Sequence, residues 1–573
     1  MDARVRVADV LRAVPSLVAD GPMMLGGLVG LVSVKPTTAK SVGLVFQEAA
    51  ARHPGRDFLR FEDTAITYGA ANATVNRMAS ALAARGVGPG SVVGVMAPNA
   101  PNTLLVALAV VKLGAAAGMI NHNQRGEVLD HSVRLLDAVV LVAGGEHREL
   151  LPDALDIDTL AEEGTSAANP ERTAAITAGT TAFLIFTSGT TGLPKASAMS
   201  HFRWLKSMAG LGKLGVRLRG GDALYCCLPL YHNNALTVSL SSVLAAGATF
   251  ALGRSFSASR FWDEVIRTGA TAFCYIGELC RYLLNQPERA AERDHDVRVV
   301  VGNGLRPELW DDFTSRFGIK RVAEFYGASE CNLAFVNALN VPRTAGACPL
   351  PHAVVEYDGD SARRVGGRLR KVKTGEVGLL LTKVTDRAPF DGYTDAEATE
   401  KKLVRDAFAD GDCWFDTGDL VRAQGFKHVA FVDRLGDTFR WKGENVATTE
   451  VEAAVDEHAD VDQSVVYGVA VPGADGKAGM AAVKLREGAD FDGTGMAEHL
   501  RGRLPGYAVP LFVRVIDAVE QTSTFKSRKV DLRAEGYEVD GSGSGAVHVL
   551  KDGGYVPYYA DYPAEVAAGT IRT

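Results

Sequence analysis

Cysteine is scarce in this sequence and follows no pattern. The chain has 573 residues but only seven cysteines, with no C-x-x-C pair and no Cys/His spacing typical of zinc sites. This odd, scattered set argues against a disulfide framework and against a zinc-binding module. We therefore expect a reduced chain in a cytoplasmic setting, and a core role rather than catalysis for cysteines such as Cys226 and Cys227.

An excess of positive charge is also absent. The 61 Lys and Arg residues face 68 Asp and Glu residues, for a net charge of −7, which disfavours a nucleic-acid binder. With 47% hydrophobic and 23% charged residues, the composition is that of a folded globular protein. Single cores stop growing at roughly 250–300 residues, so we expect more than one domain.

No clean membrane span stands out. The stretch between Asp222 and Arg254 lacks charge, but Pro229 and a His-Asn-Asn run interrupt it. It is better interpreted as a buried helix, a glycine stop and a strand over 248–252. Residues 21–34 are apolar but too short to span, and no good signal cleavage site follows them. The first 35 residues are predicted to form a helix pair that lies on a membrane surface or packs on the body; both alternatives stay open.

From Ser41 onward, helical and strand patterns alternate. Helices are predicted at 42–53 and 104–113, and strands at 90–96, 135–142 and 182–186. The expected fold class is α/β: a large N-terminal domain of β-sheets covered by helices, and a small mobile α+β C-terminal domain. The small domain shows a helix pattern at 451–458 and a strand pattern at 465–471. The predicted organisation is an N-terminal helical segment (1–40), a large domain (41–433), a small domain (434–540), and a flexible linker with a tyrosine-rich tail that docks on a domain surface (541–573).

One loop has the composition of a phosphate cradle. The apolar strand Phe183–Phe186 leads into Thr187, and a run of small and hydroxyl residues then ends at Lys195. Small residues let backbone N–H groups approach an anion, hydroxyls add donors, and the lysine adds positive charge. The loop is not a Walker A motif, because Pro194 precedes the lysine and prevents a helix from starting there. The small and hydroxyl residues are Ser188, Gly189, Thr190, Thr191 and Gly192.

The segment Ser188-Gly-Thr-Thr-Gly-Leu-Pro-Lys195 resembles the signature loop of the adenylate-forming superfamily, which includes acyl-CoA synthetases, luciferases and peptide-synthetase adenylation modules. Further motifs follow in the order of that family, so that the resemblance covers roughly 42–532. The forms Gly302–Pro307 and Asp433–Asn445 are most similar to the fatty-acid-transport-protein, or very-long-chain acyl-CoA synthetase, branch. The other motifs are Pro229–His232, Tyr326–Glu330, Phe415–Asp419 and Thr522–Lys526.

The resemblance implies a nucleotide site built from these motifs. Tyr326 would stack on adenine, Asp419 would accept both ribose hydroxyls, and Arg434 would reach ribose or phosphate. Glu330 would hold a Mg²⁺ that bridges ATP oxygens, and Ser329 would lie near the α-phosphate. The turn Gly302, Asn303 and Gly304 would form the wall at the adenine edge. The full ATP/AMP-binding set is Thr187, Ser188, Gly189, Thr190, Thr191, Gly192, Lys195, Gly302, Asn303, Gly304, Tyr326, Gly327, Ala328, Ser329, Asp419 and Arg434.

The resemblance also implies the catalytic and acyl-side residues. His232 would lie beside the acyl pocket, and Lys526 would be the catalytic lysine, although Phe525 precedes it where relatives have glycine and Lys529 is a rival. The hinge position, usually Asp or Lys, is Gly436 here. The apolar lining after His232 would be Ala235, Leu236, Val238 and Leu240. The candidate catalytic set is Lys526, Thr187, His232 and Glu330, and the loop on the CoA side is Lys442, Gly443 and Glu444.

The expected function is an AMP-forming ligase that activates a long- or very-long-chain fatty acid with ATP and transfers it to CoA. Such a reaction needs positioning and charge stabilisation rather than a protein nucleophile. Two alternatives stay open: an acyl-AMP ligase that loads a carrier protein, and a fatty-acid uptake or scaffold protein. Expected partners are fatty acid, ATP and CoA, with Mg²⁺ and no nucleic acid. The expected location is cytoplasmic or peripheral on the inner face of the cell membrane, and the oligomeric state stays open.

Overall fold

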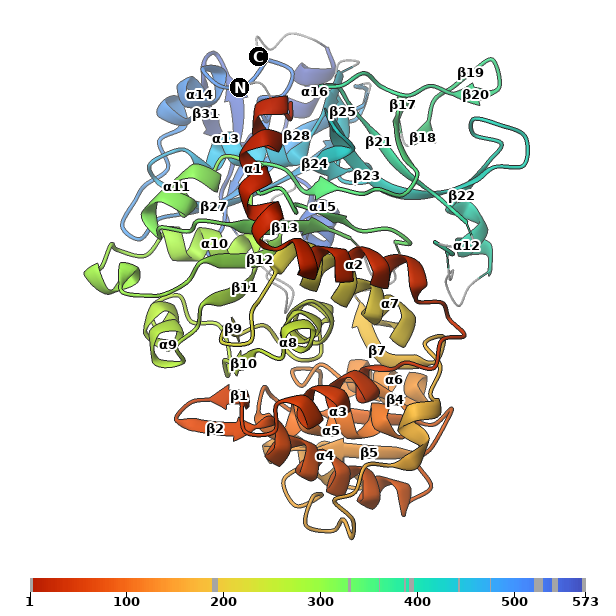
Figure 1. Ribbon diagram of the computed structural model, residues 1–573. Helices are drawn as coiled ribbons and strands as arrows, with labels where there is room; N and C mark the ends of the chain where they lie inside the picture. Colours follow the sequence, from red (N-terminus) through yellow and green to blue (C-terminus); the bar gives the residue numbers. More distant parts are fainter. Residues whose placement is uncertain are drawn as a thin grey trace. The chain divides into compact units, whose positions relative to one another are not determined.

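The computed structural model describes residues 4–187, 194–327, 331–359, 361–385, 388–390, 396–441, 444–474, 476–519, 529–537 and 545–568, with only the backbone for Thr187 and a few others. The chain forms two compact units. We call Val5–Ala347 the N-terminal unit, and Cys348–Thr573 together with Met1–Arg4 the C-terminal unit. Figure 1 shows the elements of both.

The first sheet of the N-terminal unit has six strands in the order β6-β5-β3-β4-β7-β8. All neighbouring pairs are parallel except β7 with β8. The strands are β3 (Val92–Met96), β4 (Ala116–Met119), β5 (Val140–Ala143), β6 (Leu155–Asp156), β7 (Thr181–Thr187) and β8 (Lys195–Ser200). The helices among these strands and before them are α3 (Val42–Arg52), α4 (Tyr68–Ala83), α5 (Pro101–Lys112) and α6 (Gly126–Leu136). Ten residues of α5 are buried, as expected for a helix that is apolar on all sides.

The second sheet of this unit runs β2-β1-β10-β9-β11-β12-β13-β14-β15. Its central strands, from β1 through β13, are parallel. They are β1 (Asp57–Phe61), β2 (Thr64–Thr67), β9 (Ala223–Cys226), β10 (Thr249–Leu252), β11 (Ala272–Ile276), β12 (Val299–Asn303), β13 (Val322–Tyr326), β14 (Phe335–Val336) and β15 (Gly346–Ala347). Crossover helices are α7 (His201–Ser207), α8 (Leu240–Ala246), α9 (Phe261–Arg267), α10 (Gly277–Leu284) and α11 (Trp310–Arg316). Continuous apolar strands of this kind are typical of sheets covered on both faces.

The N-terminal unit begins with two helices, α1 (Val7–Ala19) and α2 (Gly21–Ser33), bent by 96° at their junction. The predicted helix pair is therefore confirmed. α2 packs on the π-helical segment η3 (Met208–Val216) through its small residues. A Cβ atom on Gly27 would lie only 2.8 Å from the carbonyl oxygen of Ala209, so this close approach requires glycine.

The C-terminal unit contains a sheet in the order β16-β21-β23-β24, with β22 beside β23. Its second sheet has the order β27-β28-β29-β30-β31 and carries its own apolar core. The strands of the first are β16 (His352–Val355), β21 (Val377–Lys383), β22 (Leu403–Arg405), β23 (Cys413–Gly425) and β24 (His428–Arg434). Those of the second are β27 (Val461–Ala470), β28 (Lys477–Leu485), β29 (Phe512–Val515), β30 (Val547–Lys551) and β31 (Gly554–Pro557). Short ribbons and helices complete the unit: β17 (Tyr357–Asp358) with β18 (Ser361–Ala362), β19 (Arg364–Val365) with β20 (Arg368–Leu369), β25 (Phe439–Trp441) with β26 (Glu444–Val446), α12 (Ala396–Lys401), α13 (Thr448–Asp456), α14 (Gly493–Arg501), α15 (Val530–Glu535) and α16 (Tyr562–Ala567).

Three expectations need correction. The strand predicted at 135–142 is the end of α6 followed by β5, because residues 135–136 continue the helical pattern and a left-handed Asp137 stops it. The uncharged stretch contains the strand β9 in addition to the predicted helix and strand. The tyrosine-rich tail supplies β30 and β31 to the sheet, and Tyr562, fully buried, donates to the Leu550 carbonyl. It is therefore part of the fold rather than a segment docked on its surface.

Candidate active site

The carboxyl ends of the parallel strands in the second sheet meet at one edge. β12 ends at Asn303 and its neighbour β13 ends at Tyr326, while the loop after β9 leads to His232. In open α/β sheets, ligands bind at this edge. The structure therefore brings together three of the predicted site residues from distant parts of the sequence.

The glycine turn at the end of β12 is tightly constrained. A Cβ atom on Gly302 would lie 2.2 Å from the Tyr275 carbonyl oxygen, and Gly304 has a φ of +88°. Both positions therefore require glycine. Between them, the Asn303 side-chain oxygen accepts a hydrogen bond of 3.1 Å from the Asn234 amide. This bond links the predicted adenine wall to the His-Asn-Asn run that follows β9.

Glu324, which the sequence reading missed, anchors this turn. Its carboxylate accepts hydrogen bonds from the backbone N–H groups of Gly304, at 2.6 Å, and Leu305, at 3.3 Å, and from the Tyr275 hydroxyl. Burial raises the pKa of Glu324 to about 8, although these donors act in the opposite direction. The sequence does contain a signal for this residue, because Glu324 is the single acidic residue inside an otherwise apolar strand.

Glu324→Gln is expected to change how stability depends on pH. Because the pKa rises from 4.5 to about 8 on folding, the folded chain binds more protons in this window, so the native protein loses stability as pH rises through it. Gln keeps an acceptor for the turn but does not titrate. The free energy of unfolding of the variant relative to that of the native protein should therefore rise with pH, by up to about 1.4 kcal/mol per pH unit, and thermal midpoints across this pH range measure the change. Parallel midpoint curves for the two proteins would contradict this role.

A group of aromatic and histidine rings joins the two sheets of the N-terminal unit. Tyr231 packs against His232 with ring centroids 4.5 Å apart and against His122, after β4, at 5.4 Å. His147 packs edge-on against His122 at 5.4 Å. Burial, with the nearby His147, lowers the pKa of His122 to about 4, so this ring is neutral at physiological pH. The carboxyl edges of both sheets therefore meet beside the predicted acyl-side residue His232.

Asn99 fixes the loop that precedes His232. Its side chain, 3% exposed as a residue, donates to the carbonyls of Leu228 and Gly253 at 3.0 Å and accepts from the Leu230 N–H at 2.8 Å. The predicted apolar lining that follows is buried in η4 (Asn234–Ser239) and at the start of α8. Its members are Ala235, Leu236, Val238 and Leu240.

The predicted phosphate loop connects β7 and β8. Thr187 pairs with Lys195 across these antiparallel strands, so the described ends of the loop are adjacent. Lys195 is exposed and opens a strand, in agreement with the expectation that no helix starts after Pro194. His131 lies within 3.0 Å of the Pro194 carbonyl oxygen.

In the C-terminal unit, Asp419 and Arg434 lie directly opposite each other on β23 and β24. The Arg434 Nε atom is 3.8 Å from an Asp419 carboxylate oxygen. The Asp419 side chain is 10% exposed, whereas that of Arg434 is 60% exposed and extends into solvent. The two residues predicted to bind ribose and phosphate are therefore neighbours. Gly436 lies two residues after Arg434, and the exposed Glu444 begins β26.

Lys529, the rival of Lys526, is held in place by two neighbours. Its ammonium lies 2.9 Å from the buried Glu452 carboxylate and donates to the Thr448 hydroxyl at 2.8 Å. Thr448 in turn donates to the buried Asp433 carboxylate, whose pKa is raised by burial. These contacts give Lys529 a structural role in holding α13.

Several predicted positions lie outside the described residues. Gly327 follows Tyr326 and is exposed, but the residues after it in the same motif are not described. The positions concerned are the Thr187 side chain, Ser188, Gly189, Thr190, Thr191, Gly192, Ala328, Ser329, Glu330, Lys442, Gly443 and Lys526.

Comparison with known families identifies the class. Residues 46–385 match the AMP-binding enzyme family, and residues 450–526 match the AMP-binding enzyme C-terminal domain. The first match alone covers more than half of the chain. The protein therefore belongs to the AMP-binding enzyme family, and the resemblance to adenylate-forming enzymes is confirmed.

Individual relatives show which members of this family the chain resembles. It is 57% identical, over 99% of its length and 97% of the relative, to the medium/long-chain-fatty-acid–CoA ligase FadD6 of Mycobacterium tuberculosis. It is 39% identical to long-chain fatty acid transport protein 2 of Rattus norvegicus, over 86% of this chain and 85% of that protein. The predicted proximity to the fatty-acid-transport-protein branch is confirmed.

Solved structures confirm the predicted fold class. The O-succinylbenzoate CoA synthetase of Bacillus subtilis, in complex with AMP, aligns with a TM-score of 0.69 at 23% identity, over 87% of this chain and 98% of that one. ATP-bound MatB from Rhodopseudomonas palustris aligns with a TM-score of 0.71 at 22% identity, over 86% and 98%. At these identities the likeness concerns the fold.

Proposed function

We propose that this protein is an AMP-forming fatty acid–CoA ligase. A carboxylate oxygen attacks the α-phosphate of ATP, giving acyl-adenylate and pyrophosphate, and the CoA thiol then displaces AMP to form the thioester. The observation that carries this proposal is 57% identity over nearly the whole chain to a protein named as a fatty-acid–CoA ligase. Production of acyl-CoA, AMP and pyrophosphate from fatty acid, ATP and free CoA is the direct test.

The described residues suit this chemistry. The shielded carboxylate of Asp419 can accept the ribose hydroxyls, and the exposed guanidinium of Arg434 beside it can reach ribose or phosphate. Tyr326 and the Asn303 turn at the carboxyl edge would hold adenine. Lys195 and the loop after Thr187 would bind the phosphates, and Lys526 would stabilise the charge that develops on the α-phosphate.

Mg²⁺ is proposed as the metal, held by Glu330 together with ATP oxygens. One carboxylate plus substrate phosphates is the ligand set this ion prefers. Within the described parts of the chain, no group of three or more His, Cys, Asp or Glu side chains could hold a metal by itself. This agrees with an ion that arrives with the nucleotide. When bound, the ion would neutralise charge on the departing pyrophosphate.

The domain organisation is proposed as well: a large domain over 41–433, and a small one that begins at 434, rotates about Gly436 and, beyond the expected end at 540, includes β30 and β31. Rotation would withdraw Lys526 after the first step and bring Lys442, Gly443 and Glu444 beside the pantetheine of CoA. A Cβ atom on Gly436 would meet nothing within 4 Å, so the position has free space around it.

The substrate is proposed to be a long-chain fatty acid. Each methylene that enters an apolar tunnel contributes up to ~0.8 kcal/mol, so kcat/KM should rise about fourfold per carbon until the tunnel ends. Pyrophosphate release across carboxylates from acetate to very long chains measures this. A preference for acetate or an aromatic acid over palmitate would contradict the proposal. Release without acyl-CoA would favour a ligase that loads a carrier protein, and no release would favour a transport or scaffold role.

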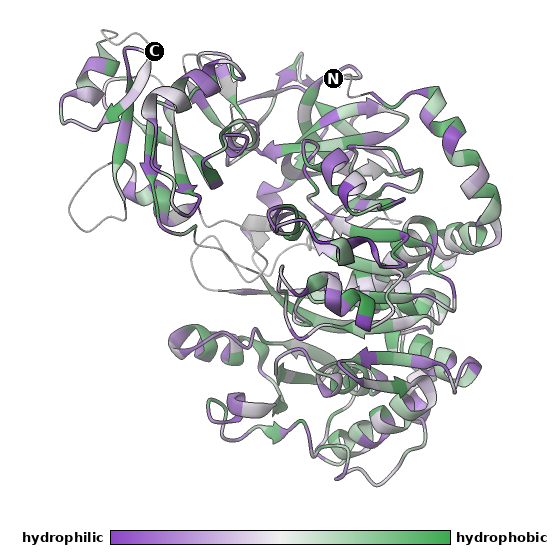
Figure 2. Ribbon diagram, turned by 90° about the vertical axis from the view of Figure 1, so that its left-hand side faces the viewer, coloured by the Kyte–Doolittle hydropathy of each residue, from purple (hydrophilic) through white to green (hydrophobic). Residues whose placement is uncertain are grey.

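The protein is proposed to act in the cytoplasm, in peripheral contact with the inner face of the membrane. Among the described residues, no single helix qualifies as a membrane span, although the bent α1–α2 pair qualifies by length and composition. These helices present apolar side chains to solvent at helical spacing, and Figure 2 colours hydrophobic residues along both. The exposed residues are Val7, Leu11, Val14 and Val18 on α1, and Leu25, Leu28, Val29 and Val32 on α2.

Replacing Leu11 and Val18 with serine is expected to weaken membrane binding. These side chains are 63% and 73% exposed and neither is assigned to the site, so the fold and the turnover of a soluble medium-chain acid should not change. Each lost apolar side chain should lower partition into vesicles about tenfold. Co-sedimentation with phosphatidylcholine vesicles measures the change. Equal binding of variant and native protein would contradict contact through α1.

A further inference from the structure

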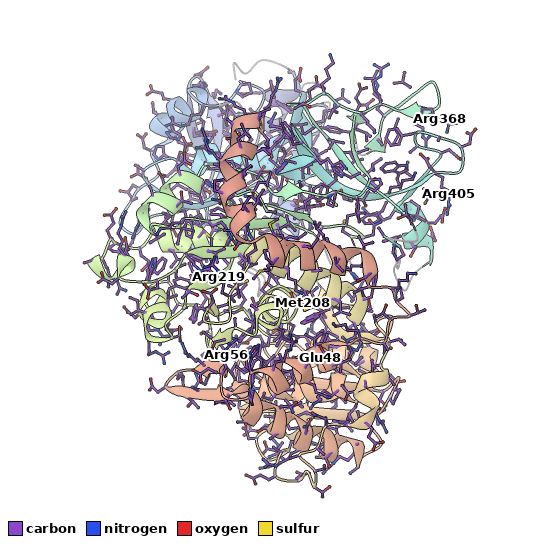
Figure 3. The ribbon with its side chains drawn as sticks, viewed as in Figure 1. Glu48, Arg56, Met208, Arg219, Arg368 and Arg405 are labelled. Carbon is purple, nitrogen blue, oxygen red and sulfur yellow. The ribbon has the colours of Figure 1, made fainter. Side chains whose placement is uncertain are left out.

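A groove runs beside the start of α2. It has a volume of about 510 Å³ and is lined by Pro22, Met23 and Gly26 of α2 and by Lys213, Leu218 and Arg219. Figure 3 labels Arg219 below the bend between α1 and α2, and Met208, where η3 begins, beneath α2. The groove belongs to the N-terminal unit and involves none of the residues assigned to nucleotide or acyl binding. Apart from two cations, Lys213 and Arg219, its lining residues are uncharged.

Lys213 is the first of these cations. A Cβ atom on Gly26 would lie 3.7 Å from the ammonium nitrogen of Lys213, so this positive charge packs against α2. Among the described residues, the ammonium has no hydrogen-bond acceptor and no carboxylate partner. Burial lowers the pKa of Lys213, and the nearby Lys40 and Arg52 lower it further. The lysine therefore adds positive charge to a region that is already positive.

Arg219 belongs to a cluster with too few carboxylates. It lies 3.4 Å from the Asp20 carboxylate, which also faces Arg217 at 3.2 Å and Arg321 at 3.9 Å. A second carboxylate, Asp222, is paired with Arg298. Four guanidinium groups therefore share two carboxylates, and Arg217 and Arg298 contribute to a lowered pKa at Arg321, chiefly caused by burial. An anion in the groove would offset this excess charge.

The exposed apolar residues of α2 continue from the groove along the same helix. Gly27 and Gly30 face η3, whereas Leu25, Leu28, Val29 and Val32 face solvent. A bilayer that receives the apolar side chains places its headgroups at the level of the flanking cations. We propose that this groove binds the headgroup of an anionic membrane lipid through Lys213 and Arg219. The proposal rests on the peripheral membrane contact proposed above and adds lipid selectivity to it.

Binding of the full chain to two kinds of vesicle tests this site. One kind contains phosphatidylcholine alone and the other phosphatidylcholine with phosphatidylglycerol. The native protein should prefer the anionic vesicles, and salt should weaken that preference. Lys213→Gln and Arg219→Gln should each lower binding to anionic vesicles about fivefold and leave binding to neutral vesicles unchanged. Lys213→Arg should retain the preference. Arg134→Gln, which removes an exposed charge from α6, is the matched control and should have no effect.

The outcomes separate this proposal from the one on which it rests. Equal binding to both vesicles, unchanged by Lys213→Gln, would overturn the headgroup site and leave the apolar contact intact. If Arg134→Gln and Lys213→Gln lowered binding to anionic vesicles by the same factor, the preference would depend on net charge alone. That result would also overturn the site. Absence of binding to either vesicle would overturn both proposals. Turnover of a soluble medium-chain acid by every variant shows that the fold is retained.

Discussion

Lys526→Ala is expected to slow acyl-adenylate formation by about 10²–10³-fold, the cost typical of removing one donor that stabilises transition-state charge. Because Lys526 would act only in the adenylation arrangement, the variant should still convert supplied acyl-adenylate and CoA to thioester. Pyrophosphate exchange measures the first half-reaction, and thioester release from added acyl-adenylate measures the second. Equal loss of both halves would contradict the assignment.

Lys529→Ala is the matched control, and the structure predicts a different result for it. Lys529 is bound to Glu452, whose side chain is 6% exposed, and to Thr448. Removing one partner of a buried pair leaves an uncompensated charge and costs about 3–5 kcal/mol. The variant should therefore lose thermal stability without a selective loss of adenylation. A selective loss in Lys529→Ala, with Lys526→Ala active, would reverse the two assignments.

Gly436→Pro should give the opposite defect to Lys526→Ala: adenylate formation is retained and thioester formation is lost. Proline fixes φ near −65° and restricts the preceding residue, so the backbone resists the change that domain rotation requires. A loss comparable to that of Lys526→Ala, about a hundredfold or more, is expected in thioester release from supplied acyl-adenylate.

Gly436→Ala separates this effect from simple crowding. A Cβ atom at this position meets nothing within 4 Å, so alanine should be tolerated in both half-reactions. Gly443→Leu should resemble the proline variant, because a bulky side chain would narrow the proposed pantetheine path. Normal thioester formation by Gly436→Pro would show that the pivot lies elsewhere.

The family and the fold class could be predicted from the sequence because short linear motifs and apolar patterns carry them, and the same motifs supply the candidate site residues, which stay predictions. The segment from Ser188 to Lys195 can be recognised without knowing what lies beside it. Helices and strands could also be predicted where a continuous apolar run is bounded by clear stop signals, as in α5, which is followed by Gly114, and in β7. The strand expected at 135–142 failed because a short apolar run does not distinguish the end of a helix from the start of a strand.

Other features depend on contacts between residues far apart in the chain, and these only the tertiary structure decided. The approach of Asp419 to Arg434 depends on the register of β23 and β24, and the anchoring of Gly304 depends on a buried carboxylate at Glu324. The sequence by itself determined that the first residues form two apolar helices. Which face of α2 is buried is set by the close fit of its glycines against η3, and this packing leaves Leu25, Leu28, Val29 and Val32 in solvent.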